Sequence, residues 1–417
     1  MMKPFRSTIS LDDALTIVRD AIVPIARTER VAIEAAHGRV LAETITARAD
    51  VPSFTRSAMD GYAVIAADTQ GASREHPVTL TLTGRLYAGD TSEGGAGITS
   101  GVCMEIATGA PLPSGADAVV MVEETAIASA TNSIEVFAAV RQGQHVVRRA
   151  ADMRQGDIVI QPGVTLEPSR VGALAAIGIA EVEVFAKPVV AILPTGNELV
   201  APGQPLPPGH VYDMNRYTLA ALIERHGGVA RQLPTVMDTP EAVRESLEMV
   251  NVNGSNAPAD AVDLLIFCGG SSVGERDLVI DALREKGDVL FHGIAVKPGK
   301  PTAFARLGSG STLVLGMPGN PTSCLSNAYV LMIPLLRALA RLQPDRPTIV
   351  RAPLSQRVTS PRDRLQFLPV RLENGRAEPT FKGSGEITSL SRADGYITIP
   401  LGEDAVEAGT AVDVTLY

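Results

Sequence analysis

The sequence predicts a multidomain α/β and β protein whose central domain is built on a mostly parallel sheet. Residues 188–344 alternate short apolar strand-like runs with helix-like segments, an order that produces a parallel sheet covered by helices on both faces. On either side of this region the chain has short alternating runs rich in glycine and proline, which are typical of small β domains. A length of 417 residues suits roughly two to four domains.

Bulk composition restricts the function class. The net charge of −9 argues against a nucleic-acid partner, which would need a basic surface. Cys103, Cys268 and Cys324 are far apart and form no CxxC pair, so we expect neither a disulfide framework nor a zinc cluster. The start of the chain does not resemble a signal peptide, and charged residues or proline interrupt the most apolar tracts, 171–193 and 328–340. We therefore expect a cytoplasmic protein that does not interact with membranes.

The N-terminal segment, residues 10–47, is expected to be helical. Ser10 opens it and Asp13 follows three residues later, as in an N-terminal cap. Residues 148–187 read as strand, apolar helix and strand, and this piece is expected to pack against the N-terminal helix. Residues 1–47 and 148–187 would then form one helical and mixed domain.

An inserted β-rich domain is expected over residues 48–147. Within it, Arg56, Ser57 and Asp60 form a compact polar set, although Asp60-Gly61 is also a common turn dipeptide. A second turn that offers oxygen donors begins at Thr108. The strand-like pieces of this domain are Gly61–Ala66, Val78–Thr83, Ala118–Met121 and Ser133–Val136.

The central region, residues 188–344, supplies the α/β domain, and residues 345–417 a small β-barrel-like domain. Loops that follow neighbouring parallel strands would line one edge of the sheet, where ligands usually bind. The expected strand and helix pairs are 189–193 with 215–226, 229–237 with 240–250, 263–267 with 277–286, and 313–315 with 322–341.

A glycine-rich loop, Gly269–Gly274, follows one of these strands. Such a loop lets backbone N–H groups approach an anion, and the dipole of the following helix favours negative charge. The alternative is an ordinary tight turn, because the loop lacks the P-loop pattern. Asp277, at the helix start, is either an acidic cap or a metal ligand.

Two lysines, Lys297 and Lys300, lie on a loop stiffened by proline. Restricted backbone holds amines in place, as a phosphate site requires. The alternative is a solvated turn with two exposed lysines. A further stiff turn, Gly316–Ser323, precedes an apolar helix, and Thr322 or Ser323 either donates hydrogen bonds to a ligand or caps that helix.

Three acids follow neighbouring strands of the α/β domain. Glu198 and Asp238 come directly after strand ends, and Asp277 follows the glycine loop. Each has a simple alternative as a helix cap, since the helix after Asp238 starts at Pro240. Together with the lysines and the glycine loop, the acids predict a Mg²⁺ and phosphate site, because Mg²⁺ takes few carboxylates plus substrate oxygens.

These motifs together resemble one family, the molybdopterin molybdenumtransferases, which are molybdenum insertases related to the C-terminal part of gephyrin. The resemblance runs from about residue 10 to residue 417 and rests on the order of the motifs. They are Ser57–Ala63, Thr108–Pro113, Pro194–Glu198, Gly269–Gly274 with Asp277, Lys297–Pro301 and Pro318–Pro321.

The resemblance implies an activity and an assembly. Members take adenylylated molybdopterin and molybdate, with Mg²⁺, and release molybdenum cofactor and AMP. It implies an elongated four-domain homodimer, with the active site between the α/β domain of one subunit and the β-rich domain of the other. The molybdopterin adenylyltransferase and molybdoenzymes are the further partners that it suggests.

Site residues carry over by motif match. The catalytic set would be Asp60, Glu198, Asp238 and Asp277, with Glu198 and Asp277 as metal ligands. Two positions depart from the family pattern: Gly293 stands where some relatives have lysine, and Asn197 replaces a common acid. The substrate-binding set would be Thr108, Asp152, Gly269, Gly270, Ser271, Ser272, Gly274, Lys297, Lys300, Pro318, Gly319, Asn320, Arg364 and Ser384.

Alternative functions are also compatible with the sequence. A molybdopterin adenylyltransferase would resemble the α/β domain alone, and the additional domains argue against it. A non-catalytic molybdopterin-binding scaffold would bind partners without needing Glu198, Asp238 or Asp277. Tungstate is an alternative to molybdate, because the two oxyanions are too alike for a sequence to separate.

Overall fold

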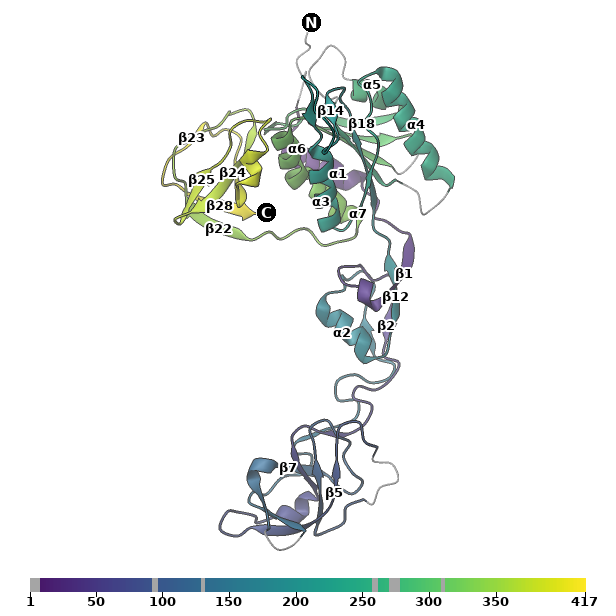
Figure 1. Ribbon diagram of the computed structural model, residues 1–417, viewed down its shortest axis with the longest axis vertical. Coiled ribbons are helices and arrows are strands. Elements are labelled where there is room, and N and C mark those ends of the chain that lie inside the picture. Colours follow the sequence, from purple (N-terminus) through teal and green to yellow (C-terminus); the bar gives the residue numbers. More distant parts are fainter. Residues whose placement is uncertain (1–7, 92–96, 129–131, 257–261, 270–277, 309–311) are drawn as a thin grey trace. The chain divides into compact units, whose positions relative to one another are not determined.

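The chain folds into two compact units (Figure 1). The computed structural model describes residues 8–417 except 92–96, 129–131, 257–261, 270–277 and 309–311, and only the backbone of 250–256. The larger unit comprises Met1–Glu29, Gly38–Val40 and Glu183–Tyr417. The smaller unit comprises Arg30–His37 and Leu41–Val182.

A six-stranded mixed sheet forms the centre of the larger unit. Its first four strands pair in parallel, as the βα alternation predicts, and its last two pair antiparallel. The antiparallel pair arises because residues 287–307 return to the sheet without a crossover helix. The strand order is β16 (Val229–Gln232), β13 (Val189–Pro194), β17 (Leu264–Cys268), β21 (Leu313–Met317), β20 (Ala303–Leu307) and β18 (Gly287–His292).

Helices cover both faces of this sheet, so consecutive strand residues enter different cores. Along β17, Leu264, Ile266 and Cys268 join one apolar cluster, whereas Leu265 and Phe267 join the other. The first cluster includes residues of α1 (Leu11–Ala21), α3 (Asn215–Arg225), α6 (Pro321–Asn327) and α7 (Ile333–Leu339). The second includes residues of α4 (Pro240–Asn256) and α5 (Leu278–Lys286).

Helix α1 confirms the expected cap but not the expected length. The Ser10 hydroxyl accepts a hydrogen bond from the Asp13 N–H at 3.0 Å and donates one to the Asp13 carboxylate at 2.7 Å. The prediction of a helix over residues 10–47 is wrong beyond Ala21, because the chain continues into strand β1 (Thr28–Ala32), paired with β12 (Glu181–Phe185). Since α1 packs in the core of the larger unit, residues 1–47 do not stay together.

The long apolar helix predicted over residues 322–341 is divided. A π-helical turn, η4 (Ala328–Met332), separates α6 from α7. Pro334 explains the interruption, because it has no N–H to donate to the carbonyl of Val330. By length and composition Pro321–Leu339 would suffice to cross a membrane, but 67% of this segment is buried inside the protein.

The C-terminal part of the larger unit is a β domain, as predicted. Tyr329 of η4 joins it to the α/β core, because its ring packs against those of Tyr417, Tyr396 and Phe367 at centroid distances of 4.5, 6.2 and 6.5 Å. The main strand order is β19 (Val296–Lys297), β24 (Leu365–Glu373), β26 (Gly395–Ile399), β28 (Ala411–Leu416) and β22 (Ile349–Pro353), with β25 (Arg376–Pro379) beside β24. A short pair, β23 (Val358–Thr359) and β27 (Ala405–Val406), and helix α8 (Thr388–Ser391) complete it.

The smaller unit is built on a six-stranded sheet of its own. The strand-like pieces expected within residues 48–147 all form strands of this sheet, which buries a compact apolar cluster around Val64, Leu80 and Ile134. The order is β7 (Ala118–Met121), β4 (Gly61–Val64), β6 (Val102–Ile106), β5 (Val78–Leu86), β9 (Ser133–Val136) and β8 (Thr125–Ile127). Helix α2 (Pro168–Ala176) and the pairs β2 (Ile45–Thr46) with β11 (Ile158–Ile160) and β3 (Arg56–Ser57) with β10 (Val146–Val147) also belong to this unit.

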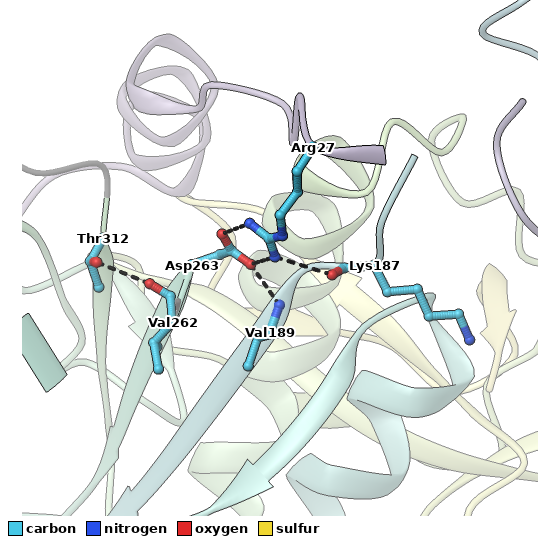
Figure 2. Close-up of polar contacts among 6 residues, drawn as sticks. All are labelled: Arg27, Lys187, Val189, Val262, Asp263 and Thr312. Atoms are coloured by element: carbon cyan, nitrogen blue, oxygen red, sulfur yellow. Dashed lines mark hydrogen bonds and ion pairs between the residues drawn. The ribbon is translucent and has the colours of Figure 1, made fainter. Parts of the chain in front are cut away.

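A partly buried ion pair fixes the amino-terminal edge of the main sheet (Figure 2). Arg27 donates two hydrogen bonds to the Asp263 carboxylate, at 2.7 and 2.5 Å. The same carboxylate accepts the Val189 N–H at 2.7 Å, at the start of β13. Asp263 therefore ties the segment after α1 and the beginning of β13 to the beginning of β17.

Candidate functional site

Loops from three parallel strands meet at the carboxyl edge of the main sheet. The Thr195 N–H, after β13, donates to the carbonyl of Cys268 at the end of β17, at 3.1 Å. The next N–H of that strand, at Gly269, donates to the carbonyl of Met317 at the end of β21, at 3.2 Å. The motifs that follow these strands, far apart in the sequence, therefore start side by side, as the sheet topology predicts.

Two glycines allow this close approach. Gly269 has a φ of 111°, and a Cβ there would lie 2.5 Å from the carbonyl oxygen of Thr195. A Cβ on Gly319 would lie 3.4 Å from the Cα of Gly269. The remaining members of the predicted glycine loop, Gly270, Ser271, Ser272 and Gly274, lie outside the described residues, as does Asp277.

Glu198 and Asp238 lie close enough to interact. The pKa of Asp238 is raised, first because the surrounding loops desolvate its carboxyl group, although its side chain reaches solvent, and second because of the charge of Glu198. The nearby Thr195 hydroxyl opposes this rise in the pKa, although its Oγ1 makes no hydrogen bond of good geometry. Asn197 holds the backbone of Asp238, since its Oδ1 accepts the Asp238 N–H at 3.2 Å.

The structure excludes the helix-cap alternative for both acids. Helix α4 is capped by Thr239, whose Oγ1 accepts the Ala242 N–H at 3.2 Å. Glu198 is followed by a short strand, β14 (Leu199–Val200), and not by a helix. Neither carboxylate is therefore occupied as a helix cap.

The two carboxylates suit a divalent cation. Desolvation first, and the charge of Glu198 second, raise the pKa of Asp238, and a bound positive charge would offset both effects. Among the described residues no group of three or more potential metal ligands gathers. Glu198 and Asp238 are therefore two carboxylates that could hold a divalent cation such as Mg²⁺, which takes few carboxylates and keeps waters and substrate oxygens as its other ligands.

Hydrogen bonds from Asn327 and Thr302 hold the lysine loop, the loop that carries Lys297 and Lys300. Gly299 has a φ of 109°, and its carbonyl accepts hydrogen bonds from the Asn327 amide at 2.8 Å and the Thr302 hydroxyl at 2.9 Å. The amide of Asn327 also donates to the Thr302 hydroxyl at 2.6 Å. Both Lys297 and Lys300 are half-buried, so the alternative of two fully exposed lysines on a solvated turn is wrong.

Strand β19 places the lysine loop beside Arg364. Val296 and Lys297 pair in parallel with Leu365 and Gln366, and the Leu365 N–H donates to the carbonyl of Ala295 at 2.9 Å. Arg364 is half-buried at the start of this pairing, and its Nε donates to the Asp363 carboxylate at 3.3 Å.

Ser384 lies against the Pro318–Asn320 turn. The Asn320 amide donates to the Ser384 hydroxyl at 3.2 Å. Thr322 contacts the same C-terminal segment, because its N–H donates to the Ser384 carbonyl at 3.0 Å and its hydroxyl donates to the Glu386 carbonyl at 2.9 Å. Thr322 thus joins two domains, a role that neither sequence alternative included.

In the smaller unit the structure brings two predicted residues together. The Asp60 carboxylate accepts the Thr108 N–H at 2.7 Å. Gly61 is required there, because a Cβ would lie 1.9 Å from the carbonyl oxygen of Val120. Asp152 is exposed, and its N–H donates to the Val51 carbonyl at 2.9 Å.

The start of α3 contains site-lining residues that the sequence analysis missed. The Asn215 amide donates to the Gly319 carbonyl at 2.8 Å, and its Oδ1 is buried without a hydrogen-bond partner. Asp213 and Arg216 form a buried ion pair with a nitrogen–oxygen distance of 2.8 Å. Their signal was three polar residues, Asp213, Asn215 and Arg216, which come directly after a short strand and at the start of a helix.

Known families match almost the whole chain. Residues 9–178 match the MoeA N-terminal region (domain I and II), residues 191–338 a probable molybdopterin binding domain, and residues 351–417 the MoeA C-terminal region (domain IV). The chain is 33% identical to the molybdopterin molybdenumtransferase of Haemophilus influenzae, over 97% of this chain and 98% of the relative. It is 34% identical to that of Bacillus subtilis, over 93% and 90%.

A solved structure shows the same architecture. The crystal structure of the molybdopterin biosynthesis MoeA protein from Pyrococcus horikosii matches with a TM-score of 0.80 and 36% identity. The match covers 98% of this chain and 99% of that one. From sequence, fold and the order of its motifs, this chain belongs to the MoeA family, which includes molybdopterin molybdenumtransferases.

Proposed function

We propose that this chain inserts molybdenum from molybdate into adenylylated molybdopterin and releases AMP, giving molybdenum cofactor. The observation that carries the proposal is the gathering of an acid pair, an anchored lysine loop and a close-approach glycine turn in one unit. These features suit a phosphoanhydride substrate, since phosphoryl chemistry depends mostly on positioning and charge stabilisation. The names of the relatives point to the same activity.

The lysine loop and the Gly269 turn would bind the phosphates. Lys297 and Lys300 carry positive charge on a loop whose backbone is fixed by Asn327. Glu198 and Asp238, with Asp277 as a further acid, would hold Mg²⁺, which supplies charge neutralisation at the phosphoanhydride. Breaking the phosphoanhydride P–O bond with water leaves AMP and the pterin phosphate, which makes insertion effectively one-way.

The contact between the Pro318–Asn320 turn and the C-terminal β domain would bind the oxyanion. Asn320 and Ser384 offer an amide and a hydroxyl at 3.2 Å from each other, and Arg364 lies one residue before the strand that pairs with Lys297. Hydroxyl, amide and cationic donors together are the groups that hold a tetrahedral oxyanion such as molybdate.

We further propose a cytoplasmic homodimer in which Asp60 contributes to catalysis and Thr108 and Asp152 to substrate binding. We also propose four domains. They are residues 1–47 with 148–187, residues 48–147, residues 188–344 and residues 345–417. The first of these domains excludes α1, which packs in the α/β core.

The test is AMP release from the purified protein given adenylylated molybdopterin, Mg²⁺ and molybdate. Molybdate-dependent AMP release with formation of active cofactor is the expected result, and a reaction without molybdate is the control. Consumption of ATP with free molybdopterin would instead indicate an adenylyltransferase. Tight binding of the adenylylated pterin without turnover would indicate a scaffold.

A further inference from the structure

The two loops that carry Glu198 and Asp238 are fastened to one side chain, that of Arg216 in α3. Its Nε donates to the Asp213 carboxylate at 2.8 Å, and its Nη2 donates to the Thr235 hydroxyl at 2.8 Å. The Asp213 side chain is only 5% exposed and that of Arg216 only 18%, so this pair is shielded from water. The bond to Thr235 is exposed, but a planar guanidinium that donates to two partners at once restricts the geometry of both.

The Asp213 arm of this connection reaches Glu198. The Asp213 N–H donates to the Val200 carbonyl at 2.9 Å, and the Val211 N–H donates to the Glu198 carbonyl at 3.0 Å. These bonds form the small parallel pair β14 and β15 (Val211–Tyr212). The backbone at Glu198 is therefore held in the register that Asp213 sets.

The Thr235 arm reaches Asp238. Thr235 lies three residues before Asp238, and the intervening Val236 N–H donates to the Pro194 carbonyl at 2.9 Å. Asn197 links the two loops directly, because its Oδ1 accepts the Asp238 N–H at 3.2 Å. Both acid-bearing loops thus connect to Arg216 through short chains of hydrogen bonds.

We propose that Arg216 is a positioning residue that fixes the spacing of Glu198 and Asp238 for cation binding. The inference rests on the proposed function, because it takes these two carboxylates as the divalent-cation ligands. Arg216 itself faces Asp213 and Thr235, so it acts through them. A lysine at this position carries the same charge but lacks the planar fork that reaches both partners.

The test compares Thr235→Val and Arg216→Lys with the native protein by Mn²⁺ binding, followed by electron paramagnetic resonance, and by AMP-release kinetics. Thr235→Val removes one hydroxyl at nearly constant volume. We expect each variant to weaken Mn²⁺ binding about tenfold and to lower kcat, as loss of a ligand-orienting contact usually does. The KM for the adenylylated pterin should change less than about twofold, since the phosphate-binding loop is untouched.

Arg244→Met is the matched control. Arg244 also makes a two-pronged ion pair, with Glu285 at 2.7 and 2.9 Å, but on the exposed surface between α4 and α5. Its loss should leave Mn²⁺ binding and kinetics unchanged. Thermal unfolding of all three variants separates a local change from general loss of structure.

Each outcome either supports or overturns the proposal. Native Mn²⁺ affinity in folded Thr235→Val and Arg216→Lys overturns it, and so does the lack of Mn²⁺ binding by the native protein. If Arg216→Lys does not fold, the Mn²⁺ affinity of Thr235→Val alone decides whether the proposal stands: weakened binding supports it and native affinity overturns it. If the native protein binds Mn²⁺ but releases no AMP, and the variants still bind Mn²⁺ more weakly, the positioning role holds and the proposed function fails.

Discussion

Asp60 of the smaller unit and Asp238 of the larger unit are both predicted catalytic acids in turns, but their environments differ. The carboxylate of Asp60 accepts the Thr108 N–H at 2.7 Å, so the protein itself satisfies part of its charge. The carboxyl of Asp238 is desolvated beside Glu198, and its pKa is raised. The comparison shows that the Asp60 carboxylate already has a backbone donor, whereas the Asp238 carboxyl group lies beside a second carboxyl group, that of Glu198.

The largest expected effect comes from removing one acid of that pair. Glu198→Gln and Asp238→Asn should each lower AMP release about 100-fold, because the charge that binds Mg²⁺ and steadies the transition state is lost. Steady-state assays across a Mg²⁺ titration measure this. Glu241→Gln, an exposed acid in the first turn of α4, is the control and should behave as the native protein does. Native turnover with unchanged metal dependence in either variant would remove Glu198 or Asp238 from the site.

Asn327→Ala tests the support under the lysine loop. The buried Gly299 carbonyl and Thr302 hydroxyl lose a shared donor, which should lower the free energy of unfolding by about 1–3 kcal/mol. Because Lys297 and Lys300 lose their fixed backbone, the KM for the adenylylated pterin should rise about tenfold. Denaturant unfolding and kinetics check the two effects. A stability loss with native KM would mean that the loop positions no substrate group.

Substitutions of Asp60 test whether its carboxylate shapes the turn or acts on the substrate. Asp60→Asn keeps an oxygen that accepts the Thr108 N–H, whereas Asp60→Ala removes it and should cost about 0.5–1.5 kcal/mol in the free energy of unfolding, because water reaches this exposed N–H. Denaturant unfolding followed by a probe in the smaller unit measures the difference. If Asp60 only shapes its turn, Asp60→Asn retains AMP release. Loss of release in folded Asp60→Asn would show that the charge itself acts on the substrate.

Much of the larger unit was predictable, because local signals and tertiary packing agree there. Ser10 with Asp13 specified a cap, and the all-apolar run at Leu264–Cys268 specified a buried strand. The helix expected after Ala21 does not form. Residues of β1 pair instead with β12, a segment far away in the sequence, and this pairing outweighs the local helical pattern. Proximity in space was the hardest property to predict, since Arg216 reaches Thr235 only through the fold.

Gly293 tests whether a departure from the family pattern is a missing contact or a backbone requirement. Its φ is 97°, and its N–H donates to the Thr302 carbonyl at 2.8 Å. Gly293→Lys should therefore lower the free energy of unfolding by about 1 kcal/mol, because a side chain is strained in this conformation. Thermal unfolding and AMP release measure the outcome. An increase in activity without loss of stability would instead show that a cation is missing at this position.

The smallest effect, and the most direct test of the comparison, is the pH dependence of stability in Asp238→Asn. The folded-state pKa of Asp238 lies above the ordinary value of 3.8. Its favourable contribution is therefore present below that ordinary value and is lost as the pH rises through the raised pKa. Asparagine does not titrate, so the melting temperature of Asp238→Asn relative to the native protein should increase slightly between pH 4 and pH 7. Mg²⁺ at pH 7 should reduce this advantage, because the cation stabilises only the intact acid pair. If the difference in melting temperature changes neither with pH nor with Mg²⁺, the Asp238 carboxyl group binds no cation and resembles that of Asp60, which accepts a backbone N–H of the protein.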